Sequence, residues 1–196
     1  MIGTIAFAVS GAVLGIEKKM DILGVVVLGE VTSIGGGIIR DLLLGNTPPN
    51  AFTHPIYATV ALFVSLIMFI PKVRNTFVGK SETFDKIMLI MDSIGLGVFT
   101  VVGIHVANGF DSNGFLAVFV GVLTGVGGGL TRDVISDSMP YIFTKHFYCS
   151  ASIIGALVTV SVNTIYNETA GMIVGTVLIF VLRILAAHFR WKLPRA

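Results

Sequence analysis

Residues 33–49 read SIGGGIIRDLLLGNTPP and residues 125–141 read GVGGGLTRDVISDSMPY, two stretches of one pattern in a single chain. Each has three consecutive glycines, two further residues and an Arg-Asp pair, and a proline follows seven positions later. Glycine weakens a helix by about 1 kcal/mol relative to alanine, and charged residues are costly in apolar surroundings. Because the glycine triplet and the Arg-Asp pair both occur twice, we interpret each stretch as a copy of one functional element.

Composition places the chain in a membrane. Of its 196 residues, 54% are hydrophobic and 12% are charged, whereas soluble domains have about 25% charged residues. The mean hydropathy is +0.91. A soluble domain could not bury so much apolar surface, so we expect much of it to face lipid. The net charge of +2 is small and says nothing about nucleic acid, and no nucleic-acid partner is expected. The single cysteine, Cys149, excludes an intrachain disulfide.

Seven apolar segments follow one another, each close to the roughly 20 residues that span a bilayer. Because lipid cannot satisfy open backbone groups, we expect these segments to be helices. The sequence therefore predicts an all-α membrane protein with seven transmembrane helices and no soluble domain. The expected ranges are 2–16, 22–44, 53–70, 87–106, 114–136, 147–162 and 170–189.

The basic residues favour one orientation of these helices. Lys and Arg concentrate in the cytoplasmic segments of membrane proteins. Of the 13 here, twelve follow an odd-numbered helix or lie in its last part, and only Arg40 belongs to an even-numbered one. Arg40 and Arg132 of the repeated motif are expected at membrane depth and count little, and the other eleven all agree. We therefore predict a multi-pass protein of the plasma membrane, with its N-terminus outside and its C-terminus in the cytoplasm.

The repeat extends beyond the two motifs. Because each unit contains three helices, the second unit enters the membrane from the opposite side, which predicts an inverted repeat. The units are expected at residues 1–80 and 85–165, and a seventh helix at 169–190 lies outside the duplication, in a single membrane domain. An offset of 92 residues aligns, among others, Phe7 with Phe99, Gly11 with Gly103, Thr32 with Thr124, Arg40 with Arg132 and Pro48 with Pro140.

The glycine triplets predict breaks in helices two and five. A broken helix exposes carbonyl groups at the end of one half and N–H groups at the start of the other, and carbonyls can replace part of a cation's water shell. The alternative is close packing of two helices, which small residues permit in membranes.

The charged residues near the triplets predict an ion pathway. Arg40 and Asp41 are neighbours in sequence and do not share a helix face, so we expect each to find a partner elsewhere, or water. Arg40 is expected in the outer third of the membrane and Arg132 in the inner third, as two constrictions of one path or as anchors that reach lipid headgroups. Two further acids are either pathway residues or structural ones. The candidate pathway residues are Glu30, Gly35, Gly36, Gly37, Arg40, Asp41, Asp92, Gly127, Gly128, Gly129, Arg132 and Asp133.

No motif predicts an enzyme, a metal site or a cofactor. The sequence has no nucleophile–base pair, zinc motif or phosphate-binding loop. His54 and His146 are equivalent in the repeat, but inversion places them on opposite membrane faces, where they cannot share one ion. We interpret both as histidines of the membrane interface.

The doubled motif, followed by a seventh helix, resembles the prokaryotic trimeric intracellular cation (TRIC) channels and the related bacterial proteins labelled glycine transporters. The resemblance covers essentially residues 1–190. It implies a homotrimer surrounded by membrane lipids, with a pore through each protomer that passes monovalent cations such as potassium. The glycine triplets would line that pore, with the two Arg-Asp pairs beside them.

Three classes of function follow from these patterns. The first is a potassium channel that is not an enzyme. The second is a secondary transporter of glycine or a similar small zwitterion, for which a broken helix would offer N–H groups to a carboxylate and carbonyls to a cation. The third is a membrane scaffold or a lipid-handling enzyme.

Overall fold

The structure is a computed structural model that describes residues 1–75, 81–110, 113–144 and 147–191. These ranges contain ten α-helices and no strand. The helices are α1 (Ile2–Glu17), α2 (Ile22–Leu43), α3 (Asn50–Thr53), α4 (Ile56–Phe69), α5 (Pro71–Arg74), α6 (Ser81–Asn108), α7 (Gly114–Ile135), α8 (Tyr141–Thr144), α9 (Tyr148–Ile165) and α10 (Glu168–His188).

Within the described ranges, seven of these helices have at least 14 residues, and each overlaps one of the seven predicted segments. Five of them, α2, α6, α7, α9 and α10, are long and apolar enough to cross a membrane. The other two, α1 and α4, are apolar but shorter, with 16 and 14 residues. The prediction of an all-α membrane protein is confirmed, whereas a crossing by each of the seven helices stays a prediction.

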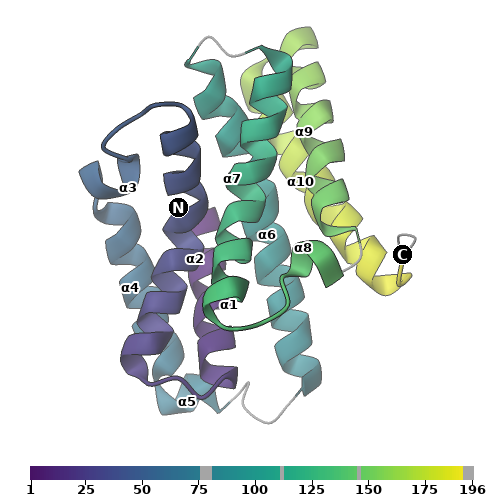
Figure 1. The fold of residues 1–196 in the computed structure, drawn as a ribbon. Helices are drawn as coiled ribbons and strands as arrows, with labels where there is room; N and C mark the ends of the chain where they lie inside the picture. The colour runs from purple at the N-terminus through teal and green to yellow at the C-terminus, as the bar shows by residue number, and fades with distance from the viewer. Residues whose placement is uncertain (76–80, 111–112, 145–146, 192–196) are drawn as a thin grey trace.

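The long helices form an upright bundle (Figure 1). In this view α2 and α7 lie side by side at the front, α4 lies on the left beside α2, and α9 and α10 lie together on the right. α1 packs against α2, α4 and α6, and α6 packs against α1, α7 and α10. The bundle thus has α1, α2, α6 and α7 at its centre.

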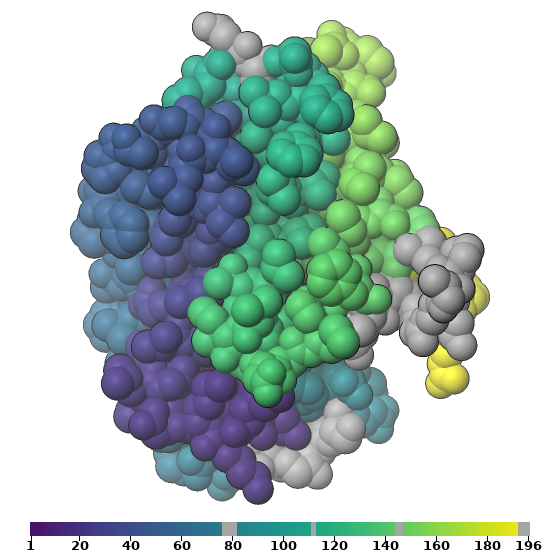
Figure 2. Space-filling view, viewed as in Figure 1, coloured from purple at the N-terminus to yellow at the C-terminus, as the bar shows by residue number. Residues whose placement is uncertain are grey.

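The surface of the bundle suits a lipid environment. Large apolar side chains lie exposed along its outer helices, among them Leu23, Phe63 and Ile173, which are 67%, 59% and 61% exposed. In Figure 2, the green segment that ends α7 and contains α8 covers the lower front of the molecule beside the purple N-terminal residues. There the Lys18 ammonium donates a hydrogen bond to the carbonyl of Asp137 at 3.4 Å.

α2 and α7 begin and end at equivalent positions, 92 residues apart. The side chain of Asp21 accepts a hydrogen bond from the backbone N–H of Gly24, and that of Asn113 accepts one from Leu116. Such caps satisfy N–H groups that have no partner within the helix. The repeated sequence therefore builds the same helix twice.

The expected breaks at the glycine triplets are absent, and this prediction was wrong. Both helices run without interruption through the triplets, over Ile22–Leu43 and Gly114–Ile135. Three glycines disfavour a helix by about 1 kcal/mol each, but an unsatisfied backbone group costs more than this where no water is available. Keeping the backbone hydrogen bonds is therefore the cheaper solution in this environment.

The middle glycine of each triplet lies where α2 and α7 cross. A Cβ atom at position 36 would collide with the carbonyl oxygen of Thr124, and one at position 128 would collide with the carbonyl oxygen of Thr32. Residue 32 of α2 thus faces residue 128 of α7, and residue 36 faces residue 124. Because the numbers rise along one helix and fall along the other, the two helices are antiparallel. The triplets thus serve the close packing that was the alternative interpretation.

Candidate ion pathway

Arg132 of α7 occupies the centre of a fully buried polar cluster. Its Nη1 atom lies 2.7 Å from Oδ1 of Asp92 in α6, and its Nε atom donates to Oδ1 of Asp133 at 2.8 Å. Nη1 also donates to the hydroxyl of Ser10 in α1. Arg132, Asp92 and Ser10 are each 0% exposed. A buried charge of this kind is tolerated only when it is paired and hydrogen-bonded.

Aromatic rings enclose the same cluster. The guanidinium of Arg132 lies 5.1 Å from the ring centre of Tyr141, and that of Arg183 in α10 lies 4.7 Å from the ring centre of Tyr148. A Cβ atom at position 129 would lie 2.9 Å from the Tyr148 hydroxyl oxygen and 3.5 Å from Oδ1 of Asp92. The last glycine of the second triplet therefore leaves room for the cluster.

Arg40 of α2 forms the corresponding pair in the first unit. Its Nε donates to Oδ1 of Asp41 at 2.8 Å, and its Nη2 lies 2.7 Å from the same oxygen. The expectation that adjacent Arg and Asp could not pair was wrong. A long arginine side chain can fold back along the helix and place two of its five donors on one carboxylate oxygen.

Each aspartate of the motif also holds the segment that follows its helix. Oδ2 of Asp41 accepts the backbone N–H of Asn50 at 2.7 Å, and Oδ2 of Asp133 accepts that of Tyr141 at 2.8 Å. Both oxygens of each carboxylate are therefore engaged. These aspartates brace the helix ends and do not present a free carboxylate to a passing cation.

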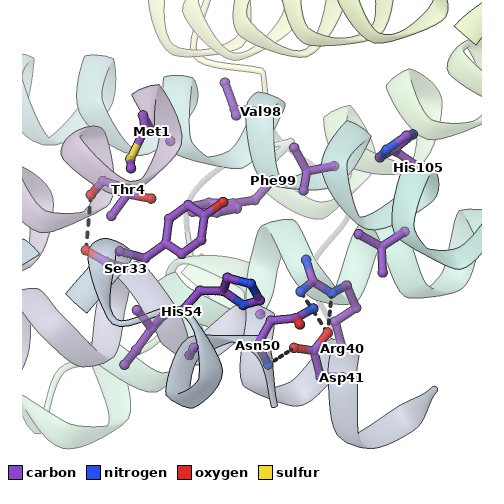
Figure 3. A pocket seen from close by; sticks show the side chains of 17 residues that line it. Met1, Thr4, Ser33, Arg40, Asp41, Asn50, His54, Val98, Phe99 and His105 are labelled. Carbon is purple, nitrogen blue, oxygen red and sulfur yellow. Dashed lines mark hydrogen bonds and ion pairs between the residues drawn. The ribbon is translucent and has the colours of Figure 1, made fainter. Parts of the chain in front are cut away.

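Two cavities open at opposite ends of α6. The first has a volume of about 420 Å³ and is lined by Thr4, Ser33, Arg40, Val98 and His105, among others. Figure 3 shows the paired Arg40 and Asp41 on one side of it, close to Asn50, with Phe99 across from them. The second cavity has a volume of about 350 Å³ and is lined by Asp85, Met88, Leu89, Tyr141, Arg183, Ala187 and Arg190.

Buried side chains separate the two cavities. Leu89 lines one cavity and Val98 the other; at a rise of about 1.5 Å per residue, these positions on α6 are roughly 14 Å apart. In this interval lie Asp92 and Leu96, both 0% exposed. The rings of Phe7 and Phe99, which are equivalent in the repeat, pack against each other with centroids 5.2 Å apart and their planes tilted by 35°. The space between the cavities is therefore closed.

The structure brings together only some of the predicted pathway residues. Arg132, Asp133 and Asp92 meet in one cluster, and Gly37, Arg40 and Asp41 line the first cavity. Gly35, Gly36, Gly127 and Gly128 lie along the interface of α2 and α7. Glu30 lies half-buried on α2 and lines neither cavity. Sequence reasoning missed Ser10, Tyr141 and Tyr148, because an isolated serine or tyrosine carries no signal in apolar sequence.

Within the part of the chain that the structure describes, no group of three His, Cys, Asp or Glu side chains could hold a metal ion. His54 lines the first cavity, whereas His146 lies outside the described residues.

Comparisons with known proteins place this architecture in one class. A solved structure described as the structural basis for conductance through TRIC cation channels is 41% identical, covers 100% of this chain and 94% of its own, and has a TM-score of 0.86. Crystal structures of the TRIC trimeric intracellular cation channel orthologue from Rhodobacter sphaeroides are 30% identical over 97% of this chain and 95% of theirs, with a TM-score of 0.88. The chain is a multi-pass helical membrane protein with the fold of these ion channels, not of an enzyme.

Sequence relatives define the family. The family described as "Glycine transporter" matches residues 1–72 and 89–164. The UPF0126 inner membrane protein YadS of Escherichia coli strain K12 is 36% identical over 99% of this chain and 92% of its own. The chain belongs to this Glycine transporter family.

Proposed function

We propose that this protein is a channel for monovalent cations, with potassium as the expected ion. The observation that carries the proposal is the similarity, over the whole chain, to a structure described as the structural basis for conductance through TRIC cation channels. The two cavities at opposite ends of α6 support it, because a pore along the bundle requires an opening at each end.

The proposed gate is the cluster of Arg132, Asp92 and Ser10. A fixed positive charge would repel a cation, so the arginine acts as a plug that must move. Two unit charges 4 Å apart interact by about 4 kcal/mol at an effective dielectric of 20. Such an energy corresponds to about three decades in an equilibrium constant. A shift of one guanidinium is therefore sufficient to change the pore from mostly closed to mostly open.

The proposed pore passes through each protomer of a homotrimer in the plasma membrane, with the N-terminus outside. Units 1–80 and 85–165 are proposed to form an inverted repeat, with residues 169–190 outside it. The reciprocal contacts of Gly36 with Thr124 and of Gly128 with Thr32 support this arrangement, because a twofold axis in the membrane plane produces such pairs. Similarity to the trimeric channel orthologue from Rhodobacter sphaeroides supports the trimer.

A second candidate function is the transport of glycine or a similar small zwitterion. Membership of the Glycine transporter family favours it, and the cavity of about 420 Å³ beside Arg40 has room for such a molecule. Alternating access would then replace a continuous pore.

Flux from proteoliposomes distinguishes the two functions. A channel releases potassium down its gradient, and the rate of this release changes with the membrane potential that the ion gradients set. A transporter instead accumulates labelled glycine by counterflow, in exchange for unlabelled glycine inside. Potassium release without counterflow supports the channel, whereas counterflow without potassium release contradicts it.

A further inference from the structure

The two arginines of the repeat have equivalent positions but different surroundings. Nη1 of Arg132 is held by the carboxylate of Asp92 and the hydroxyl of Ser10, on the side away from Asp133. In the second unit, the Nη1 side of the guanidinium therefore binds a second carboxylate, in addition to the aspartate of the motif.

The same side of Arg40 faces the first cavity. Among the described residues, its hydrogen-bond and ion-pair partner is Asp41 alone, through Nε and Nη2. Val102, equivalent to Ser10 under the offset of 92 residues, lines this cavity and offers no hydrogen bond. Asp41 is the one acidic residue among those that line the cavity. Space therefore lies beside Arg40 where protein groups lie beside Arg132.

We propose that this cavity binds a small soluble carboxylate, whose oxygens take at Arg40 the place that Asp92 takes at Arg132. Arg40 is only 7% exposed, so its position is fixed by the fold, and its remaining donors point away from Asp41 (Figure 3). Guanidinium is the group best matched to a carboxylate in geometry and charge. The site exists in a channel and in a transporter alike.

The size and lining of the cavity restrict the ligand. A volume of about 420 Å³ is at the lower end of small-molecule sites. Val98, Phe99 and Val102 form an apolar wall. Asn50 supplies a polar group beside the arginine, whereas Thr4 and Ser33 lie at the other side of the cavity (Figure 3). The cavity suits a molecule with one carboxylate and a short body, such as an amino acid or a short-chain acid.

Ligand-detected NMR on the purified protein in detergent tests this site with glycine, acetate and methylammonium as probes. Glycine and acetate are expected to bind saturably and to compete with each other. Methylammonium, which carries the amine without the carboxylate, is expected neither to bind there nor to displace acetate. Absence of saturable acetate and glycine binding, or displacement by methylammonium, overturns the proposal.

Arg40→Gln is the decisive variant, and Lys72→Gln is its matched control because it removes one positive charge from an exposed position outside the cavity. Arg40→Gln is expected to weaken acetate binding by at least about tenfold, the effect of losing a charge-assisted hydrogen bond. Lys72→Gln is expected to bind like the parent. If Arg40→Gln unfolds, Val102→Phe, which fills the cavity and leaves the arginine in place, must abolish binding. Unchanged binding in a folded Arg40→Gln or Val102→Phe protein overturns the proposal.

Discussion

At the scale of single residues, the six motif glycines differ in how closely they approach the opposite helix. Gly36 and Gly128 touch the opposite backbone, whereas a Cβ atom at position 35 would meet nothing nearer than the Thr131 hydroxyl at 3.6 Å. Ordinary contact begins near this distance, so an alanine fits at position 35. The sequence presents three identical glycines, and the crossing of two helices makes one of them indispensable.

Gly36→Ala and Gly128→Ala are each expected to destabilise the protein by about 1–3 kcal/mol, the usual cost of overpacking. Gly35→Ala is expected to leave stability unchanged or raise it by up to about 1 kcal/mol, because alanine favours the helix. Thermal unfolding of the purified variants in one detergent measures both effects. A Gly35→Ala protein that is as unstable as Gly36→Ala would contradict the assignment of the crossing.

Asp92→Asn tests the proposed gate with little change of shape. Loss of one carboxylate weakens the hold on Arg132, so the variant is expected to release potassium faster than the parent in a proteoliposome assay. Arg132 keeps Asp133, and the fold keeps its buried volume.

Glu82→Gln is the control for that change, because Glu82 lies on the same helix with its side chain 83% exposed and pairs only with the exposed Lys86 among the described residues. Its flux is expected to equal that of the parent. An Asp92→Asn protein that folds and releases potassium at the parental rate would show that the gate lies elsewhere.

At the scale of helices, the central feature is the antiparallel register of α2 and α7. A Cβ atom at position 35 would lie 3.8 Å from Cβ of Thr131. Disulfides join residues whose Cβ atoms are about 3.5–4.5 Å apart. The register therefore predicts that cysteines introduced at positions 35 and 131 can form a disulfide.

Gly35→Cys with Thr131→Cys, in a Cys149→Ser background, is expected to form an intramolecular disulfide on mild oxidation. Mass spectrometry of the joined peptides detects it. The control pairs Gly35→Cys with Leu116→Cys, which lies 15 residues away from Thr131 on the same helix, a distance of about 22 Å along its axis. Efficient bonding in the control pair and none in the test pair would refute the register.

Several helix limits could be predicted because hydrophobic runs and turn residues define them. The expected 22–44 and 114–136 lie within one residue of α2 and α7. α6 begins at Ser81, six residues before its expected start, because polar residues of 81–86 continue the helix beyond the apolar run. The four-residue helices α3, α5 and α8 carry no periodic pattern that a sequence could reveal.

The candidate site could be predicted in part. The Arg-Asp pairs and Asp92 stand out as charges in apolar sequence, and all of them are buried. The pairing of Arg132 with Asp92, 40 residues earlier, depends on how α6 packs against α7, which no local pattern encodes. The helix breaks were wrongly predicted because glycine propensities measured in water do not include the cost of opening a backbone in an apolar interior.

At the scale of the whole molecule, the orientation in the membrane is the first expectation to test. Lys72→Cys and Asn108→Cys, each in a Cys149→Ser background, are both exposed and lie at opposite ends of the bundle. With the N-terminus outside, a membrane-impermeant thiol reagent added to intact cells is expected to label position 108 and not position 72. Labelling of position 72 alone would reverse the proposed orientation.

Conduction by single proteins in a planar lipid bilayer tests the central claim most directly. The purified parent protein, between potassium chloride solutions of unequal concentration, is expected to give discrete unitary currents that reverse near the potassium equilibrium potential. Asp92→Asn is expected to stay open for a larger fraction of the time. A parent protein that folds and inserts but gives no resolvable unitary current, while it exchanges glycine in counterflow, would contradict the channel and leave the transporter.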